Sequence, residues 1–202
     1  MGRRFDPDRA HHRLAIFRRE SNLRMQHFIW VDLDRTLIKQ DSTWTCLRGF
    51  RKDSGLFQLI LLVLQCRFHR FEFKSKLCER VALESLKWNF DENLISELKL
   101  HHRKGAKIHL ITGATETAAR FFGKTLPFVS EIYFSSKDLK MKGLAKYHLM
   151  QKNSYGSLDY YGDSRHDLQI WNAIGRAHFS KSNLKVYLYY KFLRKSVEIN
   201  RY

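Results

Sequence analysis

The sequence predicts an α/β fold, a doubly wound parallel sheet of the Rossmann-like kind with a helical cap inserted after the first strand. From about residue 91 onward, short apolar runs of strand length alternate with segments suited to helices, as in parallel sheets covered on both faces. The stretch between the first strand and residue 91 is instead rich in helical signals and poor in Gly and Pro. Reactive side chains follow several of the expected strands, where sites form in such sheets.

The individual elements follow in chain order. The apolar run Phe28–Val31 predicts a first, buried strand, and Asp41 has the chemistry to cap a helix start. Helices are expected at 56–68, 71–86 and 91–103. Strands at 107–112, 132–134 and 158–161 then alternate with helices at 115–124, 143–152 and 167–174.

Four regions are expected along the chain. These are a basic N-terminal arm (1–26, with a short helix around 12–20), a core (27–37 and 91–182), a helical cap (38–90) and a basic, aromatic C-terminal segment (183–202). Within the cap, the apolar run 56–66 followed by cations has two interpretations. It is either a buried cap helix with a basic end, or an apolar surface that rests on an anionic membrane.

The composition limits the class of protein. A chain of 202 residues with 44% hydrophobic residues supports a real core. Its formal net charge of +17 favours anionic partners such as phosphorylated substrates, membranes or nucleic acid, or serves solubility alone. The three cysteines form no C-x-x-C pair, and no apolar run approaches the roughly 20 residues that span a bilayer. We expect a cytoplasmic protein, with peripheral contact to an anionic membrane as a further possibility.

Two carboxylates end the first predicted strand. Asp32 and Asp34 are one residue apart and are followed by Thr36. Alternate positions of a strand point to the same face, so both acids are expected on one side. Two converging carboxylates cannot both ionise comfortably without a cation. The motif predicts a metal site or a nucleophile beside an acid/base, with an acidic loop as the alternative.

Later strand ends carry a hydroxyl and a lysine. Thr112-Gly113 supplies a hydroxyl and a flexible turn suited to phosphate oxygens, although such a turn is often purely structural. Lys142 and Lys146 flank the start of a predicted helix, where a lysine can neutralise an anion or remain a solvated surface charge.

Asp163 and Asp167 follow the strand at 158–161, and their oxygens suit a hard cation such as Mg²⁺. With D-x-D-x-T, strand–Thr, Lys and G-D-x-x-x-D in this order, residues 28–181 resemble the haloacid-dehalogenase-like (HAD) phosphohydrolase superfamily. Segment 73–83 resembles the cap of its phosphoserine-phosphatase-like branch. The stretches 139–149 and 160–171 are similar to HAD domains joined to prenyltransferase membrane domains.

The resemblance implies roles for the motif residues. Asp32 would attack phosphorus and Asp34 would act as acid and base, while Lys146, favoured over Lys142 by the family spacing, would stabilise phosphate oxygens together with Thr112. The implied metal ligands are Asp32, Asp34 (through its carbonyl), Asp163 and Asp167, and the implied substrate contacts are Gly113, Asp41 and Arg80.

The expected function is therefore a Mg²⁺-dependent phosphatase that hydrolyses a phosphomonoester through an aspartyl-phosphate. The candidate substrates are a lipid-linked or sugar phosphate and a soluble small metabolite. The alternative is a catalytically retired HAD scaffold that binds nucleic acid or membrane, although no specific nucleic acid is expected. One departure from the family concerns Arg35, because the superfamily often has Gly at this place in the first motif.

Overall fold

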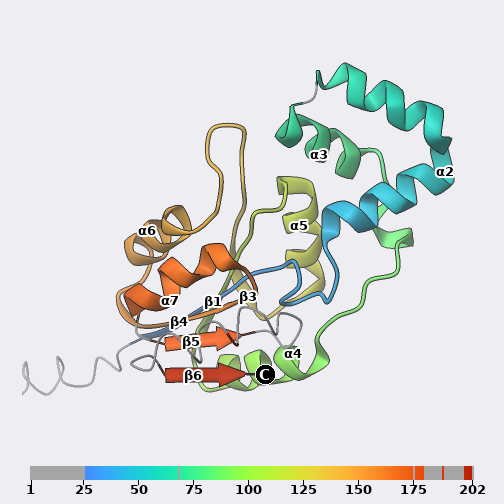
Figure 1. Cartoon of the computed structure of the whole chain (residues 1–202). Helices are drawn as coiled ribbons and strands as arrows, with labels where there is room; N and C mark the ends of the chain where they lie inside the picture. The colour runs from blue at the N-terminus through green and yellow to red at the C-terminus, as the bar shows by residue number, and fades with distance from the viewer. Residues whose placement is uncertain (1–25, 68, 175, 180–187, 189–197, 202) are drawn as a thin grey trace, which may run out of the picture.

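The computed structural model describes residues 26–67, 69–174, 176–179, 188 and 198–201. In this part of the chain, six strands form one sheet in the order β3-β2-β1-β4-β5-β6, and every neighbouring pair is parallel (Figure 1). The predicted α/β fold is confirmed. The strands are β1 (Gln26–Val31), β2 (Lys107–Ile111), β3 (Val129–Tyr133), β4 (Gly156–Gly162), β5 (Arg176–Phe179) and β6 (Glu198–Arg201).

The central strand β1 separates two hydrophobic clusters. Ile29 and Val31 face one cluster with helices α4 (Glu92–Arg103) and α5 (Glu116–Thr125). Phe28 and Trp30 face the other, with α6 (Leu144–Lys152) and α7 (Leu168–Ile174). Because successive strand residues point to opposite faces, a strand covered on both sides needs a continuous apolar run. The chain order reverses between β1 and β4, which places the sheet's switch point there.

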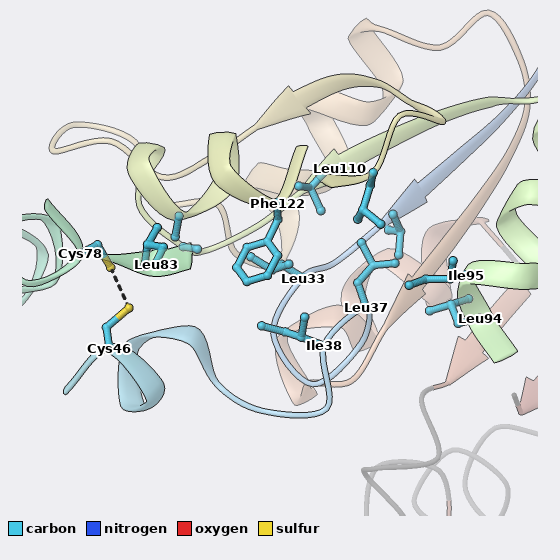
Figure 2. Close-up of a cluster of buried hydrophobic side chains, with 14 of the residues drawn as sticks. Leu33, Leu37, Ile38, Cys46, Cys78, Leu83, Leu94, Ile95, Leu110 and Phe122 are labelled. Carbon is cyan, nitrogen blue, oxygen red and sulfur yellow. Dashed lines mark hydrogen bonds between the residues drawn. The ribbon is translucent and has the colours of Figure 1, made fainter. Parts of the chain in front are cut away.

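The first cluster continues from the sheet into the cap. Figure 2 shows Leu33, Leu37 and Ile38 of the loop after β1 lying between the sheet and the cap. At its cap end, the thiols of Cys46 and Cys78 lie 3.7 Å apart and both are buried. This shared hydrophobic packing joins the cap to the core.

The cap contains α2 (Ser42–Gln65), α3 (Arg70–Glu79) and the 3₁₀ turn η1 (Leu83–Ser85), all between β1 and β2 in the chain (Figure 1). Helix α2 consists of two helical segments. The first begins at Ser42, where the Asp41 side chain accepts a hydrogen bond from the Trp44 backbone N–H and caps it. The second follows Gly55, so its start agrees with the helix predicted from residue 56, whereas its end at Gln65 comes before the predicted residue 68. Gly55, at φ 82°, kinks α2.

The predicted helix over 71–86 is also wrong at its end, since α3 stops at Glu79. The Trp88 indole donates a hydrogen bond to the Leu83 carbonyl, and the Ser85 hydroxyl donates to the Ala82 carbonyl. These side chains satisfy carbonyls in a short turn and replace the continued helical ladder.

The remaining elements agree with the predicted ones to within a few residues, except at the sheet edge. Strands β5 and β6 were not predicted, because four-residue strands carry too little periodicity and are defined by their mutual pairing. The predicted arm helix around 12–20 lies outside the described residues, as does the aromatic stretch 185–195 apart from Leu188. Among the described helices, none is long and apolar enough to cross a membrane.

A polar cluster ties three strands together on the sheet. Asp159 of β4 is buried and lies 2.7 Å from His27 Nε2, 3.0 Å from Arg176 Nη1 and 3.5 Å from His178 Nε2. Burial alone would raise the pKa of Asp159, but the hydrogen bonds and charges of His178, His27 and Arg176 outweigh it and lower the pKa to about 2. The ionised carboxylate therefore stabilises the fold.

We expect Asp159→Asn to lower the free energy of unfolding by about 2 kcal/mol near neutral pH. The folded-state pKa of Asp159 lies below its ordinary value of 3.8. The contribution of the carboxylate to the free energy of unfolding is therefore fully present above pH 3.8 and is lost as the pH falls towards about 2. Urea titrations of both proteins between neutral and acid pH measure the difference. The exposed Asp53→Asn serves as the control, and a difference that stays constant with pH contradicts the assignment.

Candidate active site

The predicted motif residues come together at the carboxyl edge of the sheet, at the switch point between β1 and β4. A cavity of about 240 Å³ opens there between core and cap. Its walls include Asp32, Asp34, Gly113, Lys146, Asp163 and Asp167. Residues far apart in the chain meet here because parallel strands present their carboxyl ends to the same edge.

Asp32 is held rigidly at the end of β1. Its backbone N–H donates to the Tyr161 carbonyl at 2.9 Å, which continues the pairing of β1 with β4. One carboxylate oxygen accepts from the Leu33 N–H at 2.8 Å, and the other lies 2.6 Å from Lys146 Nζ. Lys146 is 3% exposed and reaches Asp32 from the first turns of α6. A buried ion pair therefore defines the floor of the cavity.

A tyrosine that the sequence did not indicate links this pair to a second acid. Lys146 Nζ donates to the Tyr160 hydroxyl at 2.8 Å, and that hydroxyl donates to Asp167 Oδ1 at 2.7 Å. Burial, with the charges of Asp167 and Asp32, raises the pKa of Tyr160 well above its ordinary value, so it stays a neutral donor. Tyr160 is one of two adjacent buried tyrosines of β4 (Gly156–Gly162), and no local pattern distinguishes it from a core aromatic.

Asp167 is fixed from its other side by Ser164. The Ser164 backbone N–H and hydroxyl donate to Asp167 Oδ2 at 2.9 and 2.7 Å. The bond from the Ser164 backbone N–H is one half of a capping box at the short turn η2 (Arg165–Asp167), and in the other half the Ser164 side chain accepts from the Asp167 backbone N–H. Unlike Tyr160, Ser164 could have been found in the sequence, because its spacing from Asp167 is that of a capping box.

Three carboxylates at this edge can hold a metal ion. Oxygens of Asp32, Asp163 and Asp167 all lie within 4.8 Å of one another. Burial, with the charges of Asp32 and Asp167, raises the pKa of Asp163 to about 8. Burial also raises the pKa of Asp32, although Lys146 opposes the effect. Three buried carboxylates facing one buried lysine leave an excess of negative charge, and a hard divalent cation such as Mg²⁺ fits this all-oxygen set.

Asp34 lies in the same cavity, but its side chain is outside that group of three. Its Oδ1 accepts from the Ser42 N–H at 2.7 Å, at the start of cap helix α2. Burial, together with the charge of Asp41, raises the pKa of Asp34 to about 6. A carboxyl group with a pKa near neutrality suits proton transfer in both directions.

Arg35 occupies a backbone conformation that favours Gly. Its φ is 57°, in the left-handed region that costs residues with a Cβ about 1–2 kcal/mol. Its guanidinium borders the cavity, with Nη2 3.9 Å from Asp41 Oδ2. The arginine thus keeps the turn that Gly would favour and adds a cation beside the cap.

The other predicted residues differ in how close they lie to the cavity. Thr112 is fully buried, and its hydroxyl oxygen accepts from the Ala114 N–H at 3.1 Å. Lys142 borders the cavity but is exposed, and it is Lys146 that contacts Asp32. Arg80 lies apart from the cavity lining, at the exposed end of α3, and donates to Gln65 Oε1 at 3.2 Å.

Solved structures share this architecture. A phospho-aspartyl intermediate analogue of phosphoserine phosphatase has a TM-score of 0.56 and 15% identity, covering 88% of this chain and 94% of its own. A substrate-bound phosphoserine phosphatase has a TM-score of 0.55 and 13% identity, covering 87% and 92%. A haloacid dehalogenase-like hydrolase from Streptococcus pneumoniae has a TM-score of 0.55 and 16% identity, covering 88% and 94%.

The chain therefore has the fold of the haloacid dehalogenase-like hydrolases. Within that fold, its architecture is the one found in phosphoserine phosphatases. No protein-family model matches the sequence, and no curated protein matches it.

Proposed function

We propose that this protein is a Mg²⁺-dependent phosphatase of the HAD type, which hydrolyses a phosphomonoester through an aspartyl-phosphate on Asp32. The observation that carries the proposal is the contact of Asp32 with buried Lys146 inside the group formed with Asp163 and Asp167. The likeness to phosphoserine phosphatases supports the same reaction class.

The chemistry follows from the position of each group. A carboxylate oxygen of Asp32 attacks phosphorus, and the bond from phosphorus to the leaving oxygen breaks. Asp34 gives its proton to that leaving oxygen. It later removes a proton from the water that attacks the aspartyl-phosphate, and this attack releases phosphate and restores Asp32. Lys146 stabilises negative charge on the phosphoryl oxygens. Asp32, Asp163 and Asp167, with the backbone carbonyl of Asp34, would hold a Mg²⁺ ion, which would supply further neutralisation of the phosphoryl charge.

The cavity and the net charge support a small phosphorylated substrate. About 240 Å³ accommodates a phosphate with a small attached group, and the net charge of +17 attracts anions. A lipid-linked or sugar phosphate and a soluble small metabolite remain the two candidates. A retired scaffold that binds nucleic acid or membrane is supported by the net charge and by Arg35 beside the cavity, but it gives no reason for the buried acids and lysine.

The test is phosphate release from an aryl phosphate by the full chain. We expect release with Mg²⁺, its loss on chelation and its recovery when Mg²⁺ is restored. Because the cation neutralises buried carboxylates of the folded state, Mg²⁺ is also expected to raise the melting temperature by a few degrees. Release that is indifferent to chelation, with no thermal shift, contradicts the metal assignment. A thermal shift without turnover of any phosphomonoester favours the retired scaffold.

A further inference from the structure

The second half of α2 exposes an apolar stripe. Leu62 and Cys66 of this segment are fully buried in the cap, so the helix is already packed through another side. The kink at Gly55 turns this half away from the first half, and Figure 1 places it at the outer end of the cap. The stripe consists of Leu56, Phe57, Ile60 and Leu64, which are 58%, 70%, 48% and 56% exposed. A helix that is apolar on two sides needs a second apolar environment.

A basic pocket begins where the stripe ends. It measures about 1240 Å³ and lies between the α2–α3 corner and the segment that joins β3 to α6. Its cations are Arg67, Arg70, Lys76, Lys137 and Lys140, and its acids are Glu72 and Glu79.

The acids of the pocket are already engaged. Glu72 pairs with Lys76 at 2.7 Å, and Glu79 accepts from the Ser75 hydroxyl at 2.7 Å. In the described part of the chain, Arg67 and Arg70 form no ion pair, and both are exposed. Lys137 and Lys140 approach from the other wall, so the pocket keeps a surplus of positive charge suited to phosphate groups.

We propose that this outer end of the cap docks on an anionic lipid bilayer. The stripe enters the boundary between headgroups and acyl chains, and the basic pocket takes the phosphate of an anionic headgroup. Charge complementarity selects this occupant over a second copy of the chain, because a self-association through the same face brings two basic pockets together. The docking is independent of the phosphatase reaction, since neither the stripe nor the pocket cations line the catalytic cavity.

Vesicle co-sedimentation of the full chain tests the proposal. We expect binding to phosphatidylcholine vesicles that contain phosphatidylglycerol, and weak binding to phosphatidylcholine alone. Arg67→Gln/Arg70→Gln is expected to weaken binding to the anionic vesicles roughly 30-fold, from the ordinary contribution of two cations near such a surface. Phe57→Ser/Ile60→Ser is expected to weaken it about tenfold or more through lost apolar burial.

A matched control removes two exposed cations from the core. Lys99→Gln/Arg103→Gln, on α4, loses the same charge away from the cap and is expected to change binding less than threefold. All three variants keep the wild-type turnover of a soluble aryl phosphate, which separates a failure of docking from a failure of the proposed reaction. An equal loss of vesicle binding in the control overturns the proposal. So does a wild-type protein that binds no vesicles and forms a dimer, if Phe57→Ser/Ile60→Ser dissociates that dimer.

Discussion

Asp32→Asn is expected to lower the rate of phosphomonoester hydrolysis by a factor on the order of 10⁴, with the fold retained. Asparagine has nearly the same shape, and its amide oxygen can still accept one of the two hydrogen bonds that Leu33 and Lys146 donate to separate oxygens of the carboxylate. It cannot form the covalent aspartyl-phosphate. The loss should therefore appear in kcat and not only in KM.

Steady-state and single-turnover phosphate release measure this change, and circular dichroism verifies that the variant is folded. Asp53→Asn, on the exposed surface of α2, is the matched control and should keep wild-type activity. Hydrolysis by Asp32→Asn within tenfold of wild type would rule out Asp32 as the nucleophile.

Lys146→Met is expected to have the second largest effect, on stability as well as on rate. The lysine is the buried cation that contacts Asp32 at 2.6 Å and Asp167 at 3.8 Å. Burial alone would lower the pKa of Lys146, but these two carboxylates raise it, so the ammonium stays charged. Removing one partner of a buried pair typically costs 3–5 kcal/mol, so we expect about 3 kcal/mol less stability without metal and a rate reduced about 10²-fold or more.

Chemical denaturation with and without Mg²⁺ separates the two effects. Because Mg²⁺ supplies positive charge to the same carboxylates, it should restore part of the stability of Lys146→Met but not its rate. Lys142→Met is the control, since Lys142 borders the same cavity but is exposed. A larger loss in Lys142→Met than in Lys146→Met would reverse the choice between the two lysines.

Much of the core was predictable because its signals are local. The run Phe28–Val31 had to be a buried strand, and the acids at 32 and 34 follow it directly. The acids at 163 and 167 follow β4 in the same way. Parallel strands present these ends to one edge, and the resemblance to HAD phosphohydrolases implied that Asp32, Asp163 and Asp167 would meet there, as they do in the structure.

The cap was harder to predict because its packing is not periodic. Asp41 was expected to offer a helix cap and the helix from residue 56 was predicted, yet no bounds were predicted for the segment that Asp41 begins, which runs from Ser42 to the kink at Gly55. The apolar run 56–66 had two interpretations, and exposure of Leu56, Phe57, Ile60 and Leu64 favours the surface over the fully buried helix. Hydrophobicity alone does not tell which side of a short helix finds a partner.

The sequence by itself determined the fold class, the strand that Asp32 and Asp34 follow, and the acidic residues at the sheet edge. Only the tertiary structure decided that Lys146 is the lysine that meets Asp32, across 114 residues of chain, and that Tyr160 joins it to Asp167. It also decided that Arg35 adopts a left-handed turn. The reason is physical: periodicity and strand ends are local properties, whereas a contact between distant residues exists only once the sheet and its helices have packed.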